Sequence, residues 1–262
     1  MNRLDAAFRR LRRQRRTAFI PFVMAGDPSL AQTAALVETL AASGADIIEL
    51  GVPFSDPLAD GPTIQRAAQR ALRRRVSLAD VLGLVRRLRR RHQVPLVLLT
   101  YYNPVYHAGA RHVLAAARAA GVDGVIIPDL PAEEAQPLVR EARRQGVAAI
   151  LLAAPTSSPA RLRRIVRLAS GFIYFVSLTG TTGIRRRLPA ELERQVRRLR
   201  RLTRLPVCVG FGIATPREAR RVAAVADGVI VGSALVRVIE RHRRGRLVQA
   251  VGRFARQLRQ AI

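Results

Sequence analysis

The stretch ADIIELGVPFSDPLADG, residues 45–61, decides the fold. It begins with a short apolar run that ends near Glu49 and continues as a loop rich in proline, glycine and aspartate. The apolar run is continuous rather than alternating, which predicts a strand buried on both faces, as in a parallel sheet covered by helices. Alanine, leucine and arginine at helical spacing follow the loop. The stretch therefore indicates one unit of strand, loop and helix.

The same unit recurs along the chain. Further apolar runs, each followed by turn residues and then by an amphipathic stretch, lie at 18–26, 94–102, 122–129, 147–155, 171–177, 205–212 and 226–233. In one of these stretches Leu36, Val37 and Leu40 share a helical face, and Gly44 follows as a stop signal. The resulting units occupy 262 residues, close to the roughly 250 typical of a TIM barrel. We expect an α/β fold, a (β/α)8 TIM barrel, as a single domain over residues 1–262.

Residues 1–16, MNRLDAAFRRLRRQRR, are amphipathic and rich in arginine. Organelle transit peptides share this composition, but Leu4, Phe8 and Leu11 keep helical spacing and serine is absent. We therefore expect an extra N-terminal helix packed on the barrel. No apolar run reaches the roughly 18 residues of a membrane span, so the expectation is a cytoplasmic protein without a membrane partner.

Arginine alone supplies the positive charge, because the sequence contains no lysine and its formal net charge is +28. Nucleic-acid binders usually combine both basic residues with aromatic side chains on one face, whereas here the arginines are spread along the chain and aromatic residues are only 5%. We interpret the arginines as solvated helix faces and expect no specific nucleic-acid partner. A non-catalytic basic scaffold for nucleic acid is the alternative that the charge favours. The absence of lysine excludes a Schiff-base aldolase.

Histidine and cysteine indicate no site of their own. His92, His107, His112 and His242 show no metal-ligand spacing, and none is placed for a Ser-His-Asp arrangement. Cys208 is the single cysteine, so it can form neither an internal disulfide nor a cysteine metal site. We expect no metal centre, surface histidines and a buried Cys208.

Glycine-bearing loops follow the last three predicted strands and bring Gly183, Gly212, Gly232 and Ser233 to one rim of the barrel. Glycine lets backbone N–H groups approach an anion, and a helix that begins at Ser233 favours negative charge. Each glycine alone fits a tight turn, but together they predict the phosphate corner that many barrels have in this place. The long loop at 178–189 suggests a lid over this corner, or a solvated arginine turn.

Three acidic residues within 49–62, the later part of the opening stretch and its continuation, stand against the basic trend. If Ile48 and Leu50 point outward to the helices, Glu49 points into the barrel mouth. A carboxyl group held against apolar walls has a raised pKa and can transfer protons near neutral pH; the alternative is an ion pair with an arginine. Asp60 can accept a hydrogen bond from a substrate N–H, whereas Asp56 either caps a turn or faces a partner.

Aromatic and apolar residues near other strand ends complete the expected mouth. Three phenols either point into it or pack in the core, those of Tyr101, Tyr102 and Tyr174. Apolar surface comes from Phe22, Leu99, Leu152 and Phe211. A phosphate clamp on one side and apolar walls with carboxylates on the other suit a substrate with a phosphate at one end and an aromatic ring at the other.

Several segments resemble the tryptophan synthase alpha subunit family over residues 18–238. They are PFVMAGDP, IELGVPFSDPLADGPTIQRA, TYYNPVYHAG, DGVIIPDLPAEE, GFIYFVS, GTTG, GFGI and DGVIVGSALV. The resemblance implies a carbon-oxygen lyase of L-tryptophan biosynthesis that cleaves indole-3-glycerol phosphate to indole and glyceraldehyde 3-phosphate by retro-aldol chemistry. It implies no cofactor on this chain, and an α2β2 heterotetramer with a beta subunit that carries pyridoxal phosphate.

The resemblance also implies a role for individual residues. Glu49 becomes the general acid/base, Asp60 the group that stabilises the indole N–H, and Tyr174 the active-site tyrosine. The implied indole pocket consists of Phe22, Leu99, Tyr101, Leu152 and Phe211. The implied phosphate site consists of Gly183, Gly212, Gly232 and Ser233. Thr182 matches a lid threonine that meets Asp60 when the site closes.

The loop at 53–60 matches the segment that faces the beta subunit, which makes Asp56 an interface residue rather than a catalyst. Other phosphate-binding barrels are the nearest alternatives, such as a sugar-phosphate epimerase or a prenyl-glyceryl phosphate synthase. Epimerases usually carry paired acids or metal ligands on several strands, and the sequence does not show them.

Overall fold

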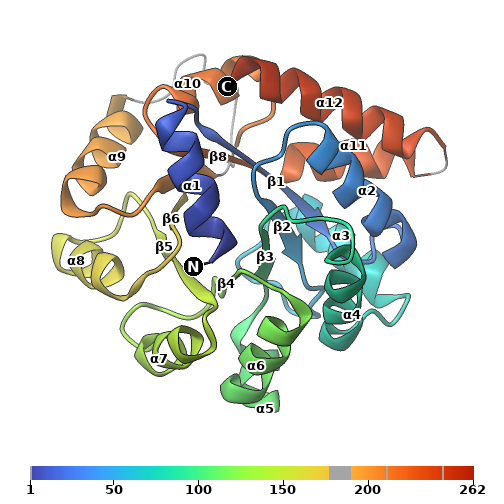
Figure 1. The fold of residues 1–262 in the computed structure, drawn as a ribbon, viewed down its shortest axis with the longest axis horizontal. Helices are drawn as coiled ribbons and strands as arrows, with labels where there is room; N and C mark the ends of the chain where they lie inside the picture. The colour runs from blue at the N-terminus through green and yellow to red at the C-terminus, as the bar shows by residue number, and fades with distance from the viewer. Residues whose placement is uncertain (1, 177–189, 211, 244) are drawn as a thin grey trace.

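The computed structural model describes residues 2–176, 190–210, 212–243 and 245–262. Strands β1 to β8 form a closed barrel in chain order, and each strand pairs in parallel with its neighbours (Figure 1). The strands are β1 Ala18–Met24, β2 Ile48–Gly51, β3 Leu96–Leu99, β4 Gly124–Ile126, β5 Ala148–Ala153, β6 Ile173–Val176, β7 Val207–Gly210 and β8 Gly228–Val231. Each lies within the apolar run that predicted it, which confirms the barrel.

Helices surround the barrel (Figure 1). They are α1 Arg3–Arg13, α2 Leu30–Ala42, α3 Pro62–Leu72, α4 Leu78–Leu88, α5 Tyr102–Ala108, α6 Ala110–Ala120, α7 Gln136–Gln145, α8 Pro159–Leu168, α9 Ala190–Leu202, α10 Pro216–Ala223, α11 Ser233–His242 and α12 Leu247–Ala261. Helix α2 begins at the Ser29 cap and ends just before Gly44, whose φ of +90° suits glycine. The predicted stop signal is confirmed.

Side chains of the strands alternate between the barrel interior and the surrounding helices. On β2 and the residue before it, Ile47 belongs to the cluster inside the barrel, whereas Ile48 and Leu50 belong to the cluster that includes the helices. Since successive side chains of a strand point to opposite faces, Glu49 faces the interior, as the sequence predicts.

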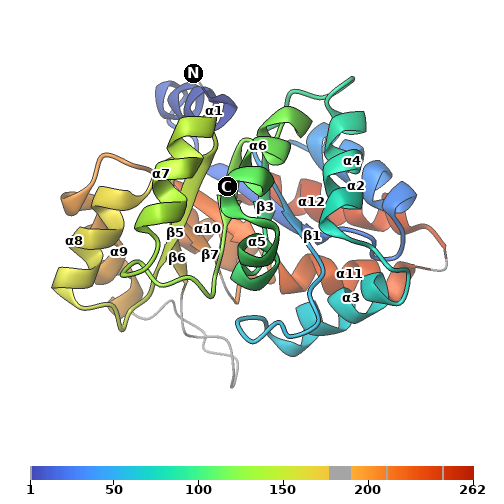
Figure 2. The same ribbon diagram turned by 90° about the horizontal axis from the view of Figure 1, so that it is seen from below.

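Helix α1 covers the end of the barrel at which the strands begin. Leu4, Phe8 and Leu11 are buried against interior residues of several strands, and the rings of Phe8 and Phe172 lie 5.8 Å apart. Figure 2 shows α1 at one edge of the molecule and the loop between β2 and α3 at the opposite edge. The predicted N-terminal helix is therefore present, and it leaves the other end of the barrel for the candidate site.

Aspartates tie neighbouring strands together at the end covered by α1. Each of three carboxylates accepts a hydrogen bond from a backbone N–H of the preceding strand. Asp46 accepts from Phe19 at 3.0 Å, Asp123 from Leu96 at 2.9 Å and Asp227 from Val207 at 2.9 Å. Each carboxylate also contacts an arginine, Arg259, Arg89 and Arg200 respectively. Part of the arginine excess is therefore structural rather than only solvated.

At the opposite end, Arg70 of α3 connects two segments next to the candidate site. Its guanidinium donates two hydrogen bonds of 2.8 Å to the buried carboxylate of Asp27, just after β1, and a third of 2.8 Å to Glu240 of α11. Because paired hydrogen bonds from arginine to a carboxylate fix orientation as well as distance, this contact holds α11 beside β1.

Candidate active site

Glu49 lies in the barrel interior on β2, with only 1% of its surface exposed. Its backbone lies in register with Phe22 of β1 and Val97 of β3, so a carboxyl group is surrounded by apolar strands. The Oε2 atom has no hydrogen-bond partner among the described residues, and no arginine of the described chain forms an ion pair with it. Within that part of the chain, the ion-pair alternative is wrong.

Burial, and after it the negative charge of Asp60, raises the pKa of Glu49 from 4.5 to about 8. A buried carboxyl group without a cation is more stable in its neutral form, because the charged form has lost its hydration. At neutral pH Glu49 is therefore mainly protonated and can donate a proton. The predicted rise in its pKa is confirmed in direction.

Asp60, at the end of the loop after β2, is held by Tyr101. The phenol of Tyr101 donates a hydrogen bond to Asp60 Oδ2 at 3.0 Å and accepts one from the backbone N–H of Ala59 at 3.2 Å. Burial raises the pKa of Asp60 to about 6, while the hydrogen bond from Tyr101 lowers it. Asp60 is therefore mainly ionised at neutral pH, opposite to Glu49.

Tyr101 itself is nearly inaccessible, with 2% of its surface exposed. Its ring stacks on Phe54 of the same loop, with ring centroids 5.1 Å apart and planes at 24°. Burial and the carboxylate of Asp60 both raise the pKa of the phenol, so it stays a hydrogen-bond donor. The contact of Tyr101 with Asp60 was not predicted, because the two residues lie 41 positions apart.

Two glycines make room for aromatic side chains at the mouth. A Cβ atom on Gly210 of β7 would lie 2.5 Å from the hydroxyl oxygen of Tyr174, and one on Gly51 of β2 would lie 2.6 Å from the ring of Phe22. Real Cβ atoms do not approach other atoms so closely, so Tyr174 and Phe22 occupy the space that the missing side chains leave.

Leu99, Leu152 and Tyr174 are partly exposed and pack on the interior cluster from the end where the strands finish. They and Phe22 form apolar surface around Glu49. The run at 94–102 predicts that Tyr101 and Tyr102 end a strand, which is wrong: β3 finishes at Leu99, Tyr101 is the residue before α5, and Tyr102 begins α5. Pro104 explains the difference, because proline lacks the N–H that a strand needs but fits the first turn of a helix.

The N-terminus of α5 depends on an acid that the sequence analysis missed. Both carboxylate oxygens of Asp129 accept the backbone N–H of Tyr102, at 2.9 and 3.1 Å. Asp129 ends the run VDGVIIPD, so an acid directly after an apolar run was the available signal.

The structure describes only part of the predicted phosphate corner, namely Gly212, Gly232 and Ser233. Gly212, with φ of +77°, follows β7, and Gly232 precedes Ser233, the first residue of α11. Within the described ranges no side chain caps this helix terminus, so that part of the chain leaves its first backbone N–H groups open to an anion. A Cβ atom on Gly232 would lie 3.8 Å from Phe22, which places the corner beside the apolar wall. Thr182, Gly183 and Phe211, together with the expected lid, lie outside the described residues.

The loop at 53–60 carries exposed side chains beside the site. Asp56 is exposed and contacts the hydroxyl of Ser55, and Leu58 is 92% exposed. An exposed leucine next to an aspartate is consistent with a surface that meets another molecule.

None of the described helices has the length and apolar character needed to cross a membrane. The described residues also contain no group of three or more histidine, cysteine, aspartate or glutamate side chains that could hold a metal ion. His107 and His112 are exposed, while His92 and His242 are half-buried, and Cys208 is buried in β7.

Known proteins resemble this chain over its full length. The model of the family described as tryptophan synthase alpha chain matches residues 8–262. The alpha chain of Geobacter sulfurreducens is 50% identical over 262 residues, which cover 100% of this chain and 99% of that one. The alpha chain of Caulobacter vibrioides is 50% identical over 240 residues, or 91% of this chain and 87% of that one.

Solved structures agree. The alpha subunit of Legionella pneumophila matches with a TM-score of 0.94 and 41% identity, covering 100% of this chain and 98% of that one. A chain of the tryptophan synthase α2β2 complex of Pyrococcus furiosus matches with a TM-score of 0.87 and 40% identity, covering 93% of this chain and 98% of that one. Taken with the site geometry, these matches show that the chain belongs to the tryptophan synthase alpha chain family.

Proposed function

We propose that this chain cleaves indole-3-glycerol phosphate to indole and glyceraldehyde 3-phosphate, in the cytoplasm. Family membership places the chain in tryptophan biosynthesis as a lyase; the substrate and the residue roles are the proposal. The observation that carries it is the pair of carboxyl groups at the mouth, Glu49 protonated and Asp60 ionised at neutral pH because their pKa values are about 8 and about 6.

The two protonation states match the two needs of a retro-aldol step. Protonation of indole C3 lets the ring accept the electrons of the breaking carbon-carbon bond, and Glu49 is the proton donor. Positive charge then develops on the ring nitrogen, where ionised Asp60 accepts the N–H hydrogen bond and offsets that charge. Glu49, now ionised, removes the proton from the glycerol hydroxyl as the aldehyde forms. These steps need no cofactor on this chain.

The rest of the mouth positions the substrate. Phe22, Leu99, Leu152 and Tyr174 provide the apolar wall for the indole ring, and Tyr101 holds Asp60 in place. The open N-terminus of α11 at Gly232 and Ser233, with Gly212 beside it, takes the phosphate. Thr182, Gly183 and Phe211 are proposed to complete the same pocket.

A tryptophan synthase beta chain is the proposed partner, in an α2β2 assembly, and pyridoxal phosphate is proposed to reside on that partner. The P. furiosus complex supports this proposal, and so does the exposed loop that carries Asp56 and Leu58. Leu58→Asp is expected to weaken binding of a beta chain, whereas Val248→Asp on α12, which is 40% exposed, is the control.

The test incubates the purified chain with indole-3-glycerol phosphate, with and without a beta chain, and measures indole. Glu49→Gln is expected to reduce indole release by at least about 10²- to 10⁴-fold, the range for a positioned proton donor. Glu134→Gln makes the same chemical change at an exposed residue and controls for charge. Full activity of Glu49→Gln would overturn the assignment.

A further inference from the structure

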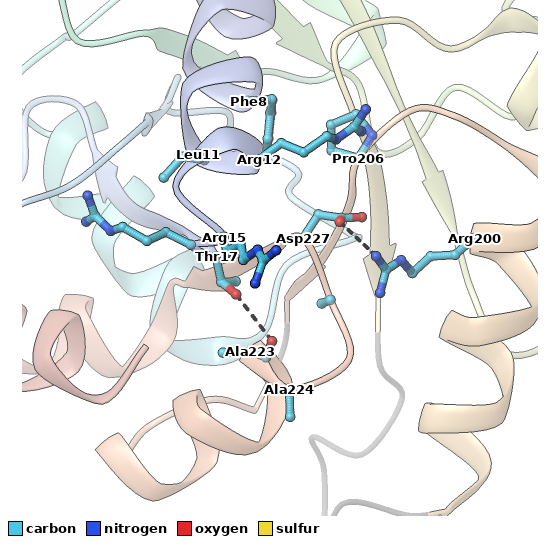
Figure 3. A pocket seen from close by; sticks show the side chains of 12 residues that line it. Phe8, Leu11, Arg12, Arg15, Thr17, Arg200, Pro206, Ala223, Ala224 and Asp227 are labelled. Carbon is cyan, nitrogen blue, oxygen red and sulfur yellow. Dashed lines mark hydrogen bonds and ion pairs between the residues drawn. The ribbon is translucent and has the colours of Figure 1, made fainter.

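A pocket of about 240 Å³ lies at the end of the barrel opposite the candidate active site. It opens between the end of α1, the connection to β1, helix α9 and the residues that lead into β7 and β8. Figure 3 shows Arg12 extending over Pro206 from α1 and Arg200 reaching Asp227 from α9. Segments far apart in the sequence therefore bring basic side chains to one hollow.

The charge around this pocket is unbalanced. Arg12, Arg15, Arg16 and Arg200 line it, and Asp227 is the single acidic residue among the lining residues. The carboxylate of Asp227 is already engaged, because it accepts hydrogen bonds from Arg200 at 3.2 Å and from the backbone N–H of Val207 at 2.9 Å. Arg12, Arg15 and Arg16 therefore line the pocket without a carboxylate partner among the lining residues.

The other contacts of these arginines leave most of their donors open. Arg12 donates to the carbonyl of Arg204 at 3.4 Å, and Arg16 donates to the side-chain oxygen of Gln14 at 3.3 Å. The backbone N–H of Arg15 donates to the carbonyl of Arg12 at 3.2 Å, but its guanidinium forms no hydrogen bond or ion pair within the described part of the chain. Each guanidinium carries five donors in a planar fork that fits phosphate oxygens in pairs.

The floor of the pocket strengthens this attraction. Phe8, Leu11 and Pro206 contribute apolar surface, and Phe8 and Leu11 are buried. Charges interact more strongly beside apolar walls than on an open surface, because less water screens them. A hollow lined by several arginines therefore favours an anion of high charge.

We propose that this pocket is a binding site for a small anion with several phosphate charges, of which inorganic pyrophosphate is the simplest. Arg12, Arg15 and Arg16 contact its oxygens, and Arg200 remains on Asp227 at the edge. The ligand bridges the end of α1 to the connection that leads into β1, so its binding stabilises this junction.

The test is calorimetric titration with pyrophosphate in metal-free buffer at constant ionic strength. Arg15→Asn with Arg16→Gln removes two of the pocket charges; asparagine is chosen because it tolerates the φ of +53° at position 15. We expect the dissociation constant to rise about tenfold or more. Indole release and the far-ultraviolet circular dichroism spectrum check that this variant remains folded.

Two matched variants decide where the anion binds. Arg9→Gln with Arg13→Gln removes the same charge from exposed residues of α1 that do not line the pocket. Ser233→Asp blocks the proposed phosphate corner at the other end of the barrel. Both are expected to keep the affinity of the unmodified chain. Equal loss in the α1 control, loss only in Ser233→Asp, or unchanged affinity in the pocket variant would each overturn the proposal.

Discussion

The phenol of Tyr101 donates a hydrogen bond to Asp60 Oδ2 across 3.0 Å, and the same phenol accepts the backbone N–H of Ala59. One side chain, two residues beyond the third strand, therefore fixes both the carboxylate and the backbone of the loop after the second strand. Asp60 is the only acid proposed to face the indole nitrogen. Because Tyr101 holds its carboxylate, the placement of that acid against the nitrogen depends on Tyr101.

Tyr101→Phe removes this hydrogen bond and keeps the ring that stacks on Phe54. A hydrogen bond to a charged group contributes about 1.5–3 kcal/mol, so we expect kcat/KM for indole release to fall about 10- to 100-fold. The pKa of Asp60 should also rise above about 6, because the lost bond lowers it. Tyr102→Phe, one residue away and without a bond to Asp60, is the control. Unchanged kcat/KM in Tyr101→Phe would contradict the positioning role.

The pH dependence of kcat/KM tests the two carboxyl groups together. Activity requires Asp60 ionised and Glu49 protonated, so the profile is expected to be bell-shaped with limbs near the pKa values of about 6 and about 8. The two groups interact, so the limbs belong to the pair. Asp60→Asn should lower the rate, remove the acidic limb and move the basic limb to lower pH, because the charge of Asp60 contributes to the raised pKa of Glu49. A profile that rises through pH 8 would contradict the role of Glu49 as acid.

Glu49 should also make stability depend on pH. Between pH 6 and 8, Glu49 is ionised in the unfolded chain but protonated in the folded one, since burial raises its pKa from 4.5 to about 8. The folded state then binds more protons, so the free energy of unfolding falls as pH rises. The loss over this interval is about 2 kcal/mol.

Urea unfolding at several pH values measures this loss. Glu49→Gln cannot ionise, so its free energy of unfolding should change about 2 kcal/mol less over the same interval. Glu134→Gln should follow the unmodified chain, because Glu134 is exposed. Parallel curves for Glu49→Gln and the unmodified chain would show that Glu49 ionises equally in both states.

The barrel could be predicted from sequence because its strands are continuous apolar runs that repeat at regular intervals. Glu49 could be placed for the same reason, since alternation along one short strand decides where it points. The hydrogen bond from Tyr101 to Asp60 could not be predicted, because it depends on how the loop after β2 folds back toward the end of β3. The roles of Gly51 and Gly210 were missed because each glycine is the last residue of a strand, and the aromatic side chain that needs its space lies on another strand.

The arginines were harder to interpret than the acids. A solvated helix face and a structural arginine look alike in sequence, because the partner of Arg89 or Arg259 lies on a distant strand. The aspartates that open β2, β4 and β8 were visible within the runs that begin at residues 45, 122 and 226. Their role became clear only when the barrel brought each next to the preceding strand.

Asp123 provides a test of this arrangement. It is 1% exposed, and it accepts hydrogen bonds from Arg89 at 2.6 Å, from Arg3 at 3.1 Å and from the backbone N–H of Leu96 at 2.9 Å. Asp123→Asn keeps the shape but leaves the largely buried Arg89 without its carboxylate. Breaking a buried pair by removing one partner costs about 3–5 kcal/mol, so we expect a loss of that order in the free energy of unfolding.

Asp227 offers the comparison, because it also accepts a strand N–H and contacts an arginine, one instead of two, but is more exposed to solvent. Its side chain is 27% exposed and that of Arg200 is 47% exposed, so solvent screens the pair and Asp227→Asn should cost about 1 kcal/mol or less. Asp5→Asn, at an exposed position of α1, controls for the change in net charge. Urea unfolding of the three variants should show a much larger loss in the free energy of unfolding for Asp123→Asn than for Asp227→Asn. Equal losses at the two positions would mean that the backbone hydrogen bond, which both share, contributes more than the buried ion pair.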